Sequence, residues 1–292
     1  HRRNGTKMIP VIDFEGPNVL DKIEEAYTTV GFAVFTNSIS RFEKASMQSW
    51  SNIMKQFFDL PLEKKMQYAY EGVDTNVGYT MWLKENVDPK APKDMKESFN
   101  YNDKRTTNWP KEIKDFETAA LVSIDVADRL TLRILEKFDD ILKSGTTIVD
   151  AHVPNYSTTR FIHYPAYKGK VEDKQMRIGE HSDYGTITLL WQINDVPGLQ
   201  VKDLKGKWHP VPYDEDGVVC NIGDLLQRWT NDYFVSTKHR VVNTHIDKVR
   251  YSMPHFVDPA EGTIIKNLTD DPDKYEPIES KEYLTWRLSQ SY

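Results

Sequence analysis

Two metal-ligating side chains stand two residues apart in the stretch GEHSDYGTITLLWQ, residues 179–192. His181 and Asp183 come just before an apolar run that is typical of a buried strand. On an extended backbone, residues i and i+2 leave the same face, so the two side chains can reach one ion. A lone H-x-D pair is weak evidence, because most such pairs are ordinary polar residues. The coordination shell therefore needs another ligand from elsewhere in the chain.

His239, in STKHRVVN, is the best candidate for that ligand among the other histidines. It lies several predicted strands after Asp183, so a folded barrel would bring it beside the pair. Two histidines and one carboxylate occupy one face of an octahedral ion and leave three positions open, which suits non-haem Fe(II) and oxygen activation. A zinc hydrolase needs a similar three-ligand shell plus water. The three ligands alone leave both metals open.

A candidate carboxylate clamp lies in VRYSMPHF, where Arg250 and Ser252 are two residues apart in a predicted strand. Both side chains should face the same side. Arginine offers a forked pair of donors, and a neighbouring hydroxyl adds a further one. The simpler alternative is an edge-strand arginine paired with an aspartate. The position of Arg250 one hairpin after His239 favours the clamp.

The elements that must position these residues fall into two parts. The N-terminal part shows helical spacing of apolar residues, with a capping box formed by Ser40 and Glu43 at the start of one helix. Residues 70–111 are rich in Gly, Asn, Asp, Lys and Pro and are expected to be irregular. After residue 155, short β-rich runs alternate with turns, which predicts a sandwich or barrel. We therefore expect a helical N-terminal half packed on an all-β core, with a closing helix near the C-terminus.

Composition limits the function classes. The chain has 292 residues and a formal net charge of −6, so nothing suggests affinity for nucleic acid or for an anionic membrane. No apolar run approaches the length of a membrane span, and the first residues lack the apolar core of a signal peptide. A single cysteine, Cys220, favours a reducing compartment. We expect a cytoplasmic protein, a monomer or weak oligomer, that acts on a small molecule.

Taken together, the motifs resemble the isopenicillin N synthase-like branch of the 2-oxoglutarate/Fe(II)-dependent dioxygenases. FIHYP at 161–165, HSD at 181, KHRVVN around 239 and RYS at 250 carry the resemblance. The N-terminal stretches IPVIDF, GFAVF, FFDLPLEKK, NVGYT and KESFNY are also similar to that branch. The ordered combination of H-x-D, a distant His and R-x-S is far more specific than any one part.

The resemblance implies a mainly β fold with flanking helices. Its core would be a double-stranded β-helix, the jelly-roll or cupin-like class, over residues 155–265. A mostly helical N-terminal region, 1–154, would pack on this core, and a C-terminal segment, 266–292, would add a helix. The three parts would form one structural unit.

The resemblance also implies cofactors and site residues. Fe(II) would be held by His181, Asp183 and His239. The distal carboxylate of 2-oxoglutarate would be held by Arg250, Ser252 and Tyr164. With O2 as the other co-substrate, 2-oxoglutarate would be cleaved to succinate and CO2 while a small molecule is oxidised, usually by hydroxylation.

Two features leave alternatives open. Many members have N-x-Y where this chain has Ile162-His163-Tyr164, so an asparagine near the site is missing. Isopenicillin N synthase and the aminocyclopropane carboxylate oxidases share the motifs without consuming 2-oxoglutarate, so an oxidase of that kind is an alternative. A zinc-bound hydrolase or a non-catalytic binder is a further one, although a mere binder would not need both the triad and the clamp.

Candidate substrate contacts come from two places. Leu190 shares the strand alternation of Thr186 and Thr188 and is predicted to wall the site. Family members often close the pocket with the region that corresponds to 70–111, so this segment is predicted to act as a lid. Its aromatic candidates are Tyr79, Phe99 and Tyr101. The histidines without partners in the motif set are predicted to be structural or exposed: His152, His209, His245 and His255.

Overall fold

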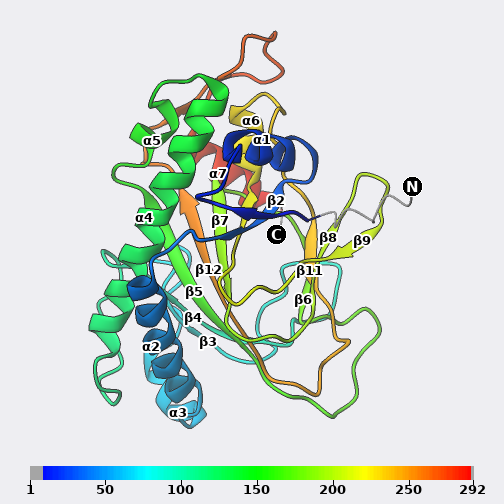
Figure 1. Cartoon of the computed structure of the whole chain (residues 1–292). Coiled ribbons are helices and arrows are strands. Elements are labelled where there is room, and N and C mark those ends of the chain that lie inside the picture. The colour runs from blue at the N-terminus through cyan, green and yellow to red at the C-terminus, as the bar shows by residue number, and fades with distance from the viewer. Residues whose placement is uncertain (1–8, 291–292) are drawn as a thin grey trace.

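The computed structural model describes residues 9–290. The core of the fold is formed by two larger β-sheets (Figure 1). The large sheet has eight strands in the spatial order β1-β2-β10-β7-β12-β5-β4-β3. Their bounds are β1 Val11–Asp13, β2 Phe32–Thr36, β3 Gly78–Thr80, β4 Glu97–Tyr101, β5 Tyr156–Tyr164, β7 Ile187–Gln192, β10 Val218–Ile222 and β12 Arg250–Asp258.

The small sheet lies opposite the large one and has the order β6-β11-β8-β9. Its strands are β6 Ile178–His181, β8 Leu199–Lys202, β9 Trp208–Pro210 and β11 His239–Val241. A separate two-stranded sheet is formed by β13 Ile264–Ile265 and β14 Ile278–Glu279. The two facing sheets form the jelly-roll core, as the sequence predicts.

Helices cover the outer side of the large sheet, where α2 and α4 lie against each other (Figure 1). The helices are α1 Val19–Thr29, α2 Arg41–Phe58, α3 Leu62–Lys65, α4 Phe116–Leu142, α5 Thr147–Ala151, α6 Asp224–Trp229 and α7 Ser280–Ser289, with a 3-10 turn at Met66–Tyr68. The predicted capping box starts α2: the Glu43 amide donates to Ser40 Oγ over 3.1 Å, and the Ser40 amide donates to Glu43 Oε1 over 2.9 Å. None of the helices within residues 9–290 combines the length and apolar character needed to cross a bilayer.

The two sides of the large sheet differ in chemistry, because successive residues of a strand face opposite sides. Side chains on the helix-covered side join the main apolar cluster, which includes Phe99, Phe161 and Met253. Side chains on the inner side join a smaller cluster that spans both sheets and includes Tyr164 on β5 and Val241 on β11. The inner side also carries polar residues, so the space between the sheets is where a site can form.

Strands from the N-terminal part complete the large sheet. β2 pairs with β10 on one side, and β4 pairs with β5 on the other. Region 1–154 is therefore more than a helical cover, since its strands share hydrogen-bond ladders with those of 155–265. Segment 70–111, which was expected to be irregular, contains β3 and β4. The expected closing helix is present as α7.

Candidate metal centre

Three metal-ligating side chains meet between the two sheets. His181 ends β6, Asp183 follows it, and His239 begins β11, which pairs with β6 so that the two histidines are opposite each other. Asp183 Oδ1 is 3.6 Å from Nε2 of His181 and 3.5 Å from Nε2 of His239. One ligand atom from each residue lies within 4.8 Å of the other two. The structure thus brings together the three residues that the sequence singles out.

Backbone carbonyls orient both imidazoles. His181 Nδ1 is 2.8 Å from the carbonyl oxygen of Gly179, and His239 Nδ1 is 3.0 Å from that of Thr237. A carbonyl oxygen only accepts, so the hydrogen sits on Nδ1 in each ring. Nε2 of each ring is then the nitrogen that lies near Asp183. This is the arrangement in which a hydrogen bond on one ring nitrogen fixes the other as a metal ligand.

Asp183 is held in the same way by two side chains that sequence analysis missed. Its Oδ2 accepts from Thr188 Oγ1 over 2.7 Å and from Asn221 Nδ2 over 2.8 Å. These residues come from β7 and β10, which are neighbours in the large sheet. Oδ1 is left facing the two histidines. Asp183 is therefore oriented from the large sheet, while the histidines are oriented from the small one.

The three side chains share one buried electrostatic environment. Burial acts to lower the pKa of His239, but the neighbouring Asp183 outweighs it and raises that pKa. Burial, together with the nearby His239, lowers the pKa of His181 to about 3, so its imidazole is neutral at physiological pH. Burial acts to raise the pKa of Asp183, but the two histidines and Asn221 outweigh it and hold that pKa below its usual range. A carboxylate and neutral imidazole nitrogens are what Fe(II) takes as ligands, and three such groups leave other coordination positions open.

A buried arginine lies on the inner side of the large sheet, the side that faces the small sheet. Arg250 starts β12 opposite Tyr164, the last residue of β5, and its side chain is 1% exposed. Its Nη1 and Nη2 have no hydrogen-bond partner among the described residues. The guanidinium carbon is 4.9 Å from the centre of the Tyr164 ring, and the Tyr164 hydroxyl is 3.4 Å from Ser252 Oγ. A buried charge needs a partner, and a carboxylate fits the free fork.

A second buried arginine, Arg177, lies beside the first and was also missed. It is 1% exposed, and its guanidinium carbon is 5.8 Å from the centre of the Tyr164 ring. Nη2 donates to backbone carbonyls, including that of Ile246 at 3.2 Å. Burial and the neighbouring Arg250 lower the pKa of Arg177 to about 10. Arg177 immediately precedes β6, and a register shift between β6 and β11 means that strand alternation could not have placed it.

A charged cluster also faces the inner side, around Arg160 on β5. Its Nε donates to Asn100 Oδ1 over 2.8 Å, and its Nη1 lies 3.2 Å from Glu85 Oε2. Arg160 and, after the opposing effect of burial, Lys96 lower the pKa of Glu85 to about 2. The Arg160 guanidinium is 5.9 Å from the ring of Phe256. A polar group is therefore built into the inner wall, from residues too far apart in sequence to form a recognisable motif.

Of the four predicted substrate contacts, Leu190 is on the inner side, paired across the sheet with Val219 and Pro254. The prediction for the other three is wrong. Tyr79, Phe99 and Tyr101 alternate with the inner residues of β3 and β4, so they face the helices and are at most 3% exposed. The physical reason is strand pairing: all three aromatic residues belong to β3 and β4, which extend the large sheet and turn these side chains toward the helices.

Phe99→Ala is accordingly expected to lower stability without affecting metal binding. The Phe99 ring packs 5.1 Å from Phe57, 5.5 Å from Phe116 and 6.1 Å from Tyr101. Removing a buried aromatic ring costs about 3–5 kcal/mol of unfolding free energy. Urea unfolding measures this loss, and a Co(II) titration of the folded variant should match wild type. Weakened Co(II) binding with normal stability would show that Phe99 contributes to the metal centre and not to the core.

The histidines predicted to be structural or exposed have other partners. His152 is buried, with its ring nitrogens 2.6 Å from the Ile148 carbonyl oxygen and 2.8 Å from Thr186 Oγ1. His255 is fully buried on the outer side, between Thr159 and Asp128. His209 pairs with Asp203, and His245 Nδ1 lies 3.2 Å from Thr244 Oγ1. None of the four belongs to the triad.

Known proteins match this chain over most of its length. Residues 155–259 match the family model for the 2OG-Fe(II) oxygenase superfamily, and residues 9–118 match the model for the N-terminal region of the non-haem dioxygenase in morphine synthesis. A proline hydroxylase of Petromyces alliaceus, buaE, is 32% identical over 91% of this chain and 89% of its own length. The 2-oxoglutarate-dependent dioxygenase htyE of Aspergillus rugulosus is 37% identical, over 54% of this chain and about half of its own length, 51%.

Solved structures give the same result for the whole fold. A full-length Neurospora crassa protein, crystallised in complex with alpha-KG, matches with a TM-score of 0.85 and 31% identity, covering 97% of this chain and 96% of that one. The same protein has also been solved with alpha-KG and thymine. The chain therefore belongs to the 2OG-Fe(II) oxygenase superfamily, in its isopenicillin N synthase-like branch.

Proposed function

We propose that this protein is a non-haem Fe(II)- and 2-oxoglutarate-dependent dioxygenase that hydroxylates a small molecule. His181, Asp183 and His239 hold the metal, and Arg250 with Ser252 and Tyr164 holds the distal carboxylate of 2-oxoglutarate. The observation that carries the proposal is the buried guanidinium of Arg250 between the same two sheets as the triad, whose Nη1 and Nη2 have no hydrogen-bond partner within residues 9–290. An oxygenase that uses a dicarboxylic co-substrate accounts for both the metal-binding triad and the buried Arg250 guanidinium.

Each residue has a definite task. When bound, Fe(II) and 2-oxoglutarate supply the oxidising chemistry, with O2 consumed and succinate and CO2 released. The three side chains would supply three ligands to Fe(II) and would leave its other coordination positions for the co-substrates. Gly179, Thr237, Thr188 and Asn221 fix the orientation of those ligands. The clamp residues hold the remote end of the co-substrate, so that its other end is directed toward the metal.

The substrate binds on the inner side of the large sheet. Leu190 is one wall residue, and Arg160 with Phe256 offers a donor and an aromatic face. Relatives bear names that refer to different small molecules, including proline and, in one solved complex, thymine. No single substrate is favoured by those names. The enzyme acts in the cytoplasm, and its single, buried cysteine suits a reducing compartment. It is a monomer or weak oligomer and does not act on nucleic acid or membranes.

The direct test is an incubation of the Fe(II)-loaded protein with 2-oxoglutarate, O2 and a metabolite library that includes proline and thymine. Succinate and substrate mass are followed together. The expected result is one oxygen atom added to one substrate, with succinate formed in equal amount. Product formed without loss of 2-oxoglutarate would instead identify an oxidase of the same fold. Tight zinc binding with no oxidation would identify a hydrolase or a binder.

A further inference from the structure

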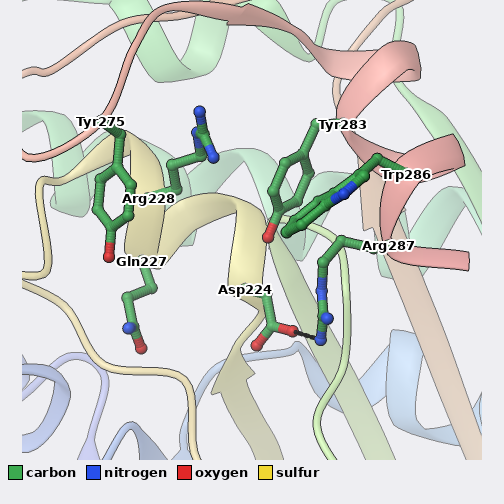
Figure 2. Close-up of a pocket in the computed structure, with 7 residues that line it drawn as sticks. All are labelled: Asp224, Gln227, Arg228, Tyr275, Tyr283, Trp286 and Arg287. Atoms are coloured by element: carbon green, nitrogen blue, oxygen red, sulfur yellow. Dashed lines mark hydrogen bonds and ion pairs between the residues drawn. The ribbon is translucent and has the colours of Figure 1, made fainter. Parts of the chain in front are cut away.

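The carboxylate of Asp224, at the start of α6, connects three separate segments of the chain. Its Oδ2 accepts from Ser182 Oγ over 3.0 Å, and its Oδ1 accepts from Ser236 Oγ over 2.6 Å. Oδ2 also accepts from Arg287 Nη2 of α7 over 2.5 Å (Figure 2). Both oxygens are therefore engaged, and each contact comes from a different part of the sequence.

Two of these segments carry the proposed metal ligands. Ser182 lies between His181 and Asp183, and Ser236 lies three residues before His239. The backbone amide of Asp224 adds a third link, because it donates to the carbonyl oxygen of Asp183 over 2.8 Å. One residue thus ties the H-x-D loop to the segment that leads into the third ligand.

The third segment is the C-terminal helix. Arg287 forms an ion pair with Asp224, and its guanidinium carbon is 4.7 Å from the ring centre of Tyr184, the residue after Asp183. The side chains of Arg287 and Asp224 are only 22% and 16% exposed, so the pair is much less screened than a surface ion pair. The pair borders a surface pocket between α6 and α7 (Figure 2). Helix α7 therefore contacts the metal-binding loop directly at Tyr184 and indirectly through Asp224.

We propose that Asp224 and Arg287 are positioning residues for the metal centre, through which the C-terminal helix sets the geometry of the triad. The proposal rests on the proposed metal site. Neither residue touches the metal. Asp224 sets the spacing between the two ligand-bearing segments, and Arg287 fixes the Asp224 carboxylate and supports Tyr184. Partners of this kind typically change metal affinity by about 10–100-fold when they are lost.

The test compares two substitutions that each remove one ion pair from α7. Arg287→Gln breaks the contact with Asp224, and Lys281→Gln breaks an exposed pair with Glu261 that is not connected to the ligand segments. Co(II), a spectroscopic substitute for Fe(II), is titrated into each metal-free protein. The Co(II) Kd should rise about tenfold or more for Arg287→Gln and stay within about twofold of wild type for Lys281→Gln.

Thermal unfolding separates positioning from general stability. Metal-free Arg287→Gln should have a lower Tm than metal-free Lys281→Gln, because its ion pair is much less exposed. Measured from each protein's own metal-free Tm, the increase on adding Co(II) should be smaller only for Arg287→Gln. Asp224→Asn, which keeps the side-chain shape, should weaken Co(II) binding at least as much.

Two outcomes are distinguishable. If Arg287→Gln and Asp224→Asn both bind Co(II) as tightly as wild type does, the positioning role is refuted while the metal site stands. If wild type itself binds no Co(II) at one equivalent, the proposed function is the part that is wrong.

Discussion

Asp183→Ala is expected to abolish the weak visible charge-transfer band that Fe(II) and 2-oxoglutarate produce together without oxygen. The band requires a metal with adjacent positions open to the keto acid end of 2-oxoglutarate. Asp183 Oδ1 is the atom near both histidine nitrogens, and it carries the charge that balances the metal. Losing a direct ligand should weaken metal binding by more than the roughly 10–100-fold seen for residues that support ligands. Anaerobic titration with absorbance detection measures the band.

The chain offers a matched control in another His–Asp pair. Asp203 Oδ2 lies 2.8 Å from His209 Nε2, beside β9, and neither residue belongs to the triad. Asp203→Ala should keep the full band. A band of normal strength in Asp183→Ala would show that the metal binds elsewhere. A wild-type protein that holds zinc tightly and never gives the band would contradict the oxygenase assignment itself.

The triad was predictable because its signal is local. His181 and Asp183 are separated by a single residue, so their shared direction follows from strand geometry alone. His239 was a candidate because it lies several predicted strands after Asp183, and the family resemblance then made it specific, because its spacing alone does not fix which strand it pairs with. The hydrogen bonds from Thr188 and Asn221 to Asp183 could not be predicted from the sequence. They depend on the register between β7 and β10, which is set by contacts between strands far apart in the chain.

The three aromatic residues of segment 70–111 show how composition can mislead. Gly, Asn and Pro in 70–111 hid two short strands, and aromatic residues in a presumed loop suggested a pocket. The stretch ESFNY, however, alternates polar and aromatic side chains, which is typical of a strand with two unlike faces. Phe99 and Tyr101 face the helices, so Ser98 and Asn100 face inward. A shift of one residue in the register of β4 would exchange the two sets of side chains and so decide which of them faces a substrate.

Arg250→Lys is expected to weaken 2-oxoglutarate binding by about 1.5–3 kcal/mol, the scale of hydrogen bonds to charged groups, or roughly 10–150-fold in Kd. Lysine keeps the positive charge but loses the fork that matches a carboxylate. It also loses the flat contact with the Tyr164 ring, 4.9 Å away in the native protein. Isothermal titration of the Co(II)-loaded variant with 2-oxoglutarate measures the change.

The ligand itself supplies the control for that experiment. Pyruvate keeps the keto acid end of 2-oxoglutarate but has no distal carboxylate, so its binding should be equal in Arg250→Lys and wild type. Co(II) affinity should also be unchanged, because Arg250 is not among the three ligands. Arg129→Lys changes an exposed arginine paired with Asp125 and should leave all three affinities unaltered. If 2-oxoglutarate binds Arg250→Lys as it binds wild type, Arg250 is not the clamp. Its Nη1 and Nη2, which have no hydrogen-bond partner among the described residues, would then bind another carboxylate, as an oxidase that uses no 2-oxoglutarate would require.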